Sequence, residues 1–246
     1  MTWLKAVLLV TAHSSTLMAA GPSASLFGVN FRTGANDSVT SVPLQILILL
    51  TALTVAPTIL MAASPFLRIT IVLHFLRQAL GTQTTPSNQV LAGLALFLTF
   101  VVTTPLVQQV RDRAWVPFEE GRMTQSEMLN EGVKPVKTFL ARFARDKDIR
   151  LFLEIGKQKA PASVEDLDLR ILVPAYILSE LRAGFQIGAV LFLPFLVIDL
   201  VVASVTLAIG MVQLPPVMIS APFKILLFVL ADGWNLTVGS LLKSFY

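Results

Sequence analysis

Four long apolar runs limit what this chain can fold into. They cover residues 44–63, 89–107, 189–212 and 217–240, and each is close to the roughly 20 residues that an α-helix needs to cross a bilayer. Only 14% of the residues are charged, against about a quarter in a typical soluble domain. Backbone groups surrounded by lipid must bond within their own segment, which helices achieve. The sequence therefore predicts an all-α, membrane-associated protein whose long helices pair as hairpins.

Prolines interrupt the apolar runs at positions where helices would bend. Pro215-Pro216 forces a turn between the last two runs. Residues 171–187 form a further apolar segment, which Pro174 and two charges predict to be broken. Bent helices that carry charges are poorly suited to face lipid on all sides. We therefore expect them to pack against protein in a larger assembly.

A polar insert, residues 108–170, separates the two halves of the chain. It holds 12 basic and 11 acidic residues, so it lacks the concentrated basic footprint that nucleic-acid binding needs. Apolar residues recur at helical spacing, as at Phe139 and Phe143 and again at Leu151, Phe152 and Ile155. The insert is therefore predicted to form short amphipathic helices, and nucleic acid is not an expected partner.

The N-terminus has the pattern of a secretory signal peptide. Residues 1–20 contain one early cation, Lys5, then a short apolar core and small residues before Gly21. An uncleaved anchor is the alternative, because the small-residue pattern before the cleavage point is imperfect. A leader rich in Gly, Ser and Asn follows at residues 21–43 and is expected to be exposed.

A signal peptide would place the start of the mature chain outside the membrane and residues 64–88 in the cytoplasm. That segment carries Arg68, His74 and Arg77 and no acid, as cytoplasmic loops tend to. The insert would then be periplasmic. The predicted order after the leader is a first helical hairpin at 44–107, the insert at 108–170 and a C-terminal hairpin region at 171–246.

The sequence lacks the residues of most catalytic and metal centres. It contains no cysteine, and only His74 would remain as a histidine after loss of the signal peptide. Phosphate-binding loops, zinc-protease motifs and nucleophile elbows are all missing. We therefore expect neither an enzyme nor a cofactor or metal, and we interpret His74 as a packed helix residue.

Three charges lie where burial is expensive. Asp199 and Lys224 lie inside apolar runs, and Glu180 lies in the segment before them. A charge at the centre of a bilayer costs about 2.5–3.5 kcal/mol on insertion scales, so such groups normally pair or line a cavity. The candidate pairings join Glu180 or Asp199 to Lys224, within one subunit or between neighbours. The alternative to a structural pair is a proton or ion relay.

Several motifs in a fixed order resemble the FliP family of flagellar export-gate proteins. They are Phe66-Leu-Arg-Ile-Thr-Ile-Val-Leu73, Leu76-Arg-Gln-Ala-Leu-Gly-Thr82, the run from Asn88 to Thr99, Leu172-Val-Pro-Ala-Tyr176, Ser179-Glu-Leu181, Ala183-Gly-Phe-Gln-Ile-Gly188, the run from Pro194 to Ser204, Pro222-Phe-Lys224, the run from Leu227 to Trp234, and the ending Ser244-Phe-Tyr246. They cover nearly all of the chain outside the leader and the insert.

The resemblance implies a core pore subunit of the flagellar type III export gate. Such proteins assemble in several copies with FliQ and FliR into a helical, pseudo-hexameric gate in the flagellar basal body at the bacterial inner membrane. That gate works with further export-apparatus proteins and passes unfolded flagellar subunits. Much of it sits above the membrane plane, so the apolar runs need not all be spans. The alternatives are the homologous gate of virulence injectisomes and, from another class, a proton-coupled small-solute transporter that uses Asp199, Glu180 and Lys224.

The resemblance also assigns roles to individual residues. A methionine-rich loop before the double proline seals the pore in this family, and Met211, Val212 and Gln213 occupy that stretch here. Only Met211 keeps the methionine pattern; its adaptable thioether side chain suits a deformable seal. Glu180 and Lys224 match two family positions, and the resemblance implies that they form a buried salt bridge between helices or subunits.

Overall fold

The computed structural model describes residues 25–26, 29–30, 42–82, 84–159, 161, 163–211 and 215–246. The predicted signal peptide, residues 1–20, and most of the leader lie outside these residues. The chain divides into two compact units, residues 1–52 and 53–246. In the first unit, β1 (Ser25–Leu26) pairs antiparallel with β2 (Val29–Asn30). Helix α2 (Val42–Ala62) begins there and ends in the second unit.

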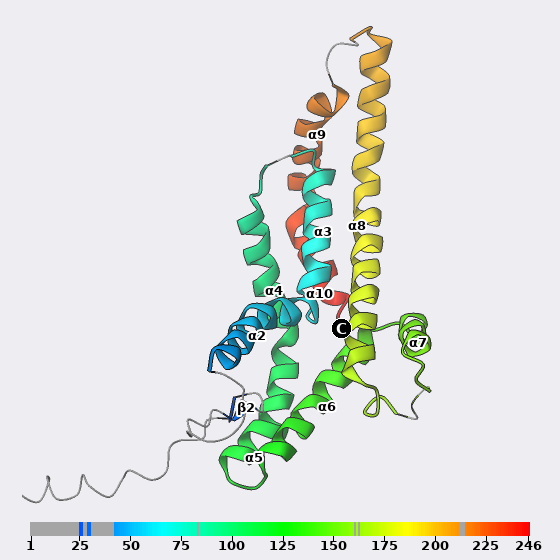
Figure 1. Ribbon diagram of the computed structural model, residues 1–246. Coiled ribbons are helices and arrows are strands. Elements are labelled where there is room, and N and C mark those ends of the chain that lie inside the picture. The colour runs from blue at the N-terminus through cyan, green and yellow to red at the C-terminus, as the bar shows by residue number, and fades with distance from the viewer. Residues whose placement is uncertain are drawn as a thin grey trace, which may run out of the picture. The chain divides into compact units, whose positions relative to one another are not determined.

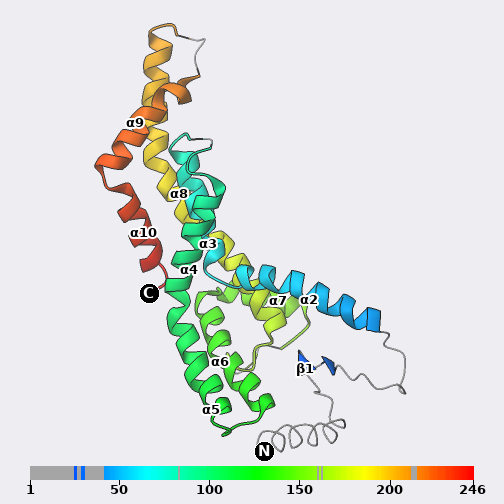
Figure 2. The ribbon, with the colours of Figure 1, turned by 90° about the vertical axis from the view of Figure 1, so that its left-hand side faces the viewer.

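Helices make up the second unit, as the sequence predicted. They are α3 (Phe66–Ala79), α4 (Asn88–Val110), the π-helical turn η1 (Arg111–Trp115), α5 (Val116–Glu119), α6 (Gln125–Phe143), α7 (Asp146–Ile155), α8 (Leu169–Ala208), α9 (Pro216–Leu230) and α10 (Gly233–Lys243). Figures 1 and 2 show α9 lying along the upper part of α8, while α5 and α6 lie at the other end of this unit. The polar insert is thus helical, and α6 and α7 carry its predicted apolar spacing.

Helix α3 forms the centre of the second unit. Its residues Ile69, Val72, Leu73 and Leu76 are buried, with at most 1% of their surface exposed. They pack against α8 and α4. Gly81, just after the helix, has a positive φ, which stops the chain from continuing as a helix.

Two glycines let α3 and α8 approach closely. A Cβ atom at Gly188 of α8 would lie 2.6 Å from Cγ of Phe75, and one at Gly184 would lie 3.1 Å from Cβ of Ile71. Real Cβ atoms essentially never approach another atom as closely as the first distance. The spacing of four residues puts both glycines on one face of α8. This face of α8 therefore lies directly on the side chains of α3.

The prediction of a broken segment at residues 171–187 is wrong. Helix α8 runs without interruption for 40 residues and includes both Pro174 and Pro194. Each proline removes only one hydrogen bond of the helix. Buried residues on both sides of Pro174, including Leu172 and Tyr176, pack against neighbouring helices and hold the backbone helical.

Among the residues that the structure describes, two helices can cross a membrane by length and composition, Asn88–Glu119 and Leu169–Ala208. Two bent pairs raise the number to four if each is one span: Ile46–Ala62 with Phe66–Ala79, and Pro216–Leu230 with Gly233–Lys243, each bent by 67°. The bend in the second pair falls at Asp232, whose φ of 49° is left-handed. This bend divides the predicted run 217–240.

Candidate functional site

The first buried charge of α8, Glu180, is bound by Arg68 of α3. The guanidinium donates two hydrogen bonds to the carboxylate, from Nε to Oε2 at 2.8 Å and from Nη2 to Oε1 at 2.5 Å. The Glu180 side chain is fully buried and that of Arg68 is 7% exposed. Paired bonds of this kind hold both groups in a single geometry as well as neutralising them.

The same guanidinium also holds the last residues of the chain. Nη1 of Arg68 donates to the carbonyl oxygen and to Oγ of Ser244, each at 3.1 Å. The group lies over the Phe245 ring, 4.1 Å from its centroid, and Arg142 of α6 donates to the carbonyl oxygen of Tyr246 at 3.2 Å. Arg68 therefore joins α3, α8 and the segment after α10, while Arg142 ties that segment to the insert.

Ser179, the neighbour of Glu180, connects α8 to the insert. Its hydroxyl lies 2.6 Å from Oδ2 of Asp148 and accepts a hydrogen bond from the backbone N–H of Arg145 at 2.9 Å. Ser179 and Asp148 are both buried. Successive residues of a helix point about 100° apart, so Ser179 binds α7 while Glu180 binds α3.

The second charged site joins α8 to α9. Nζ of Lys224 lies 2.5 Å from Oδ2 of Asp199, and Oγ of Ser220 donates to Oδ1 of Asp199 at 2.5 Å. Lys224 is buried, whereas 27% of the Asp199 side chain is exposed. Ser220 and Lys224 are four residues apart and so share the face of α9 that meets α8.

The predicted pairing of Glu180 with Lys224 is wrong within the chain. Each residue has another partner, and Lys224 meets Asp199, which lies 19 residues after Glu180. That separation is about 28 Å along the axis of α8, too far for one lysine to bridge. Of the pairings considered from the sequence, the one between Asp199 and Lys224 is present.

The α8–α9 hairpin ends in the candidate pore loop. Gly210 has a φ of 79°, and Met211 follows with 43% of its surface exposed. The other predicted seal residues, Val212 and Gln213, lie outside the described residues. Met211 is 12 residues after Asp199 and 13 before Lys224. The ion pair therefore joins α8 to α9 at nearly equal distances from Met211 at the tip of the hairpin.

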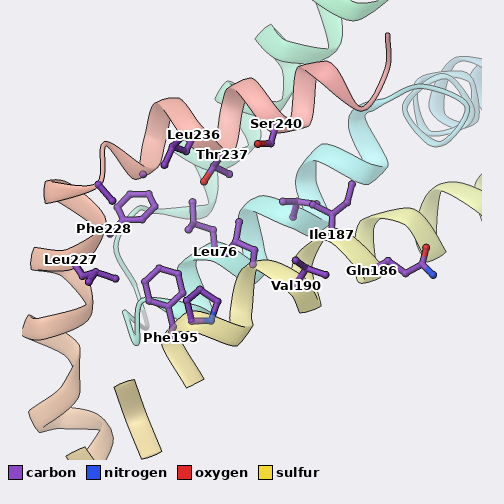
Figure 3. Close-up of a pocket in the computed structure, with 15 residues that line it drawn as sticks. Leu76, Gln186, Ile187, Val190, Phe195, Leu227, Phe228, Leu236, Thr237 and Ser240 are labelled. Atoms are coloured by element: carbon purple, nitrogen blue, oxygen red, sulfur yellow. The ribbon is translucent and has the colours of Figure 1, made fainter. Parts of the chain in front are cut away.

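An apolar pocket of about 620 Å³ lies between α3, α8, α9 and α10. Leu76, Phe195, Leu227 and Phe228 gather at one end, and Gln186 and Ser240 lie toward the other (Figure 3). Of the described residues that line it, none is charged. It is separate from both ion pairs.

Sequence reasoning missed three of the partners: Arg68, Ser220 and Asp148. Arg68 was interpreted as a charge of a cytoplasmic loop, yet it lies among the apolar residues of α3. A lone cation there, like Lys224 in its own run, requires a partner, and this signal could have identified it. Ser220 and Asp148 carry no such signal, because only the packing of distant helices brings them to their partners. His74 makes a local bond, with Nδ1 2.8 Å from the carbonyl oxygen of Thr70.

Comparison with known proteins gives a consistent result. The FliP family model matches residues 49–241. The chain is 46% identical over 217 residues to the flagellar biosynthetic protein FliP of Bacillus subtilis, covering 88% of this chain and 98% of that protein. It is 48% identical over 202 residues to the protein of the same name from Pectobacterium carotovorum, covering 82% and 78%. For the one from Borreliella burgdorferi, identity is 41% over 225 residues, covering 89% of each.

Proposed function

Because the chain belongs to the FliP family, we propose that it is a core pore subunit of the flagellar type III protein export gate. In this role it conducts unfolded flagellar subunits across the bacterial inner membrane. The observation that carries the proposal is the family match over residues 49–241, which includes both ion pairs and the hairpin tip at Met211. Its flagellar relatives favour this role over the injectisome gate.

The pairing of the buried charges supports a structural role over a transport role. Glu180, Asp199 and Lys224 each bind an opposite charge on another helix. A proton or ion relay needs groups that exchange their proton or ion during each cycle, whereas paired charges chiefly fix the positions of helices. The chain therefore serves as a wall and seal of the pore.

The exposed surface of the α8–α9 hairpin supports assembly with other chains. Large apolar side chains beyond the Asp199–Lys224 pair are more than half exposed, among them Leu200, Leu207 and Met218 at 67%, 63% and 71%. An apolar surface of this kind marks contact with protein or lipid. We propose that further copies of this chain, together with FliQ and FliR, cover it, and that the insert lies on the periplasmic side.

The experiment that tests this proposal is native mass spectrometry of the detergent-extracted chain. The chain is expressed alone and then with FliQ and FliR, with an unrelated small membrane protein as the control partner. We expect a discrete oligomer that takes up FliQ and FliR and excludes the control. A monomer or dimer that ignores both partners would overturn the proposal, and labelled-solute uptake by the chain alone would then favour the transporter.

A further inference from the structure

We propose that the apolar pocket between α8 and α10 binds one acyl chain of an anionic glycerophospholipid, whose headgroup lies against Arg182 and Lys243. This goes beyond the export role and does not depend on it. The argument rests on a change in polarity along the pocket, on two cations at its polar end, and on its length.

The pocket changes from apolar to polar along its length. One end is formed by Leu76, Phe195 and Phe228, whereas Gln186 and Ser240 lie toward the opposite end, with Thr237 between (Figure 3). Within the described part of the chain, no hydrogen bond engages the side chains of these three polar residues. They can therefore bind the ester and glycerol oxygens of a lipid whose hydrocarbon tail fills the apolar end.

Two basic residues lie beyond the polar end of the pocket. Arg182 is one turn before Gln186 on α8, and Lys243 is one turn after Ser240 on α10. Residues three or four apart share a helix face, so both cations lie beyond the polar end of the pocket. Both are exposed, and neither forms an ion pair with another residue that the structure describes. A phosphate group placed there meets two unpaired positive charges.

The length of the pocket matches that of one acyl chain. Nine residues of α8 separate Gln186 from Phe195 in its lining, which is about 14 Å along the helix. An acyl chain occupies half of the hydrocarbon core of a bilayer, which is about 15 Å. Gln186 lies just before the apolar run that begins at residue 189, where the ester groups of the bound lipid would lie. A helix of a partner protein would require neither the unpaired cations nor the change in polarity.

The test is native mass spectrometry of the full chain in detergent, titrated with phosphatidylglycerol and, separately, with phosphatidylcholine. We expect one phosphatidylglycerol to be retained per chain. The double variant Arg182→Gln/Lys243→Gln should bind it about tenfold more weakly, because each basic residue near a phosphate contributes modestly. Arg170→Gln, which removes an exposed cation of α8 away from the pocket, is the control and should leave the affinity unchanged.

A second variant tests the acyl chain apart from the headgroup. Val190→Trp puts an indole into the pocket and should abolish retention, whereas Leu196→Trp, on another face of α8, should not. Helical content and unfolding temperature identify variants that fail to fold, and the two Trp variants should match in both. Equal retention of the two lipids, or equal binding of glycerol phosphate without a chain, would overturn the proposal. So would retention that survives Val190→Trp.

Discussion

At the scale of single residues, the buried charges act through partners that are distant in the sequence. Arg68 and Glu180 are 112 residues apart, and Asp199 and Lys224 are 25 apart. Removing one member of a buried pair leaves the other charged and unpaired, which costs more than the intact pair contributes. Each pair can therefore be tested separately by neutralising one side.

Neutralising Glu180 should destabilise the chain strongly. In Glu180→Gln, the Arg68 guanidinium stays buried without a carboxylate, and we expect the free energy of unfolding to fall by about 3 kcal/mol. The measurement is thermal or denaturant unfolding in detergent, followed by circular dichroism. Glu154→Gln on the exposed side of α7 is the matched control. Equal unfolding midpoints for the two variants would contradict the role of the pair.

Charge exchange distinguishes the observed pairing from the one predicted from the sequence. Lys224→Asp should prevent assembly of the chain, and adding Asp199→Lys should partly restore it, because the pair is then rebuilt with its signs reversed. Glu180→Lys combined with Lys224→Glu should not assemble, since each exchanged residue would then face a like charge. Yield of the oligomer in size-exclusion chromatography is the measurement. Rescue by the second combination alone would instead favour a contact between neighbouring copies.

At the scale of elements, the close approach of α3 and α8 depends on Gly188. Gly188→Ala puts a methyl group 2.6 Å from the Phe75 ring, so we expect a loss of about 1–3 kcal/mol in the free energy of unfolding. Gly93→Ala on α4 is the control, because no described atom beyond its own stretch of helix lies within 4 Å of its Cβ position. That variant should gain up to about 1 kcal/mol from helix propensity. Unfolding curves of both variants in one detergent make the comparison, and a neutral Gly188→Ala would show that the helices can separate.

Helix α6 of the insert begins with a capping box that should respond to pH. Oε2 of Glu127 accepts from the Thr124 backbone N–H at 2.7 Å and from its hydroxyl at 2.9 Å, and these bonds lower the pKa of Glu127. Because the pKa is lowered, the ionised Glu127 carboxylate stabilises the start of the helix fully at pH values above its ordinary pKa near 4.5. This contribution is lost as the pH falls through the lower pKa of the folded state. Thr124→Ala should therefore speed hydrogen exchange in the first turn about fivefold at pH 7.

Low pH provides the control for this prediction. Once Glu127 is protonated in both proteins, the difference in exchange between the original chain and Thr124→Ala should become smaller. Mass-spectrometric exchange of the peptide that contains α6 gives the measurement, with α7 as the internal reference. A difference that stays constant across the titration would assign the effect to the threonine alone.

The helices could be predicted from the sequence more completely than their contacts. Local periodicity places α6 and α7, because a helix bonds within its own segment. Periodicity does not predict whether a proline breaks a helix, since that depends on packing on both sides, as at Pro174. Nor does it predict that Arg68 meets Glu180, because this contact exists only once α3 packs on α8.

At the scale of the whole molecule, Met211 should matter for the seal and not for assembly. Its side chain is 43% exposed at the hairpin tip and belongs to none of the buried clusters within the described residues. Met211→Ala should therefore assemble normally and raise the ion conductance of membranes that contain the gate. The control is Met128→Ala, a methionine of α6 in the polar insert. Unchanged conductance in assembled Met211→Ala gates would remove Met211 from the seal.

The neighbouring contacts of Ser179 and Glu180 limit how this chain can move. One residue holds α7 and the next holds α3, at about 100° around the same helix. If α8 turned about its own axis or slid along it, both contacts would be lost together. We therefore expect opening of the proposed gate to tilt or bend the hairpin beyond Asp199, while the part of α8 that holds Ser179 and Glu180 stays with α3 and α7.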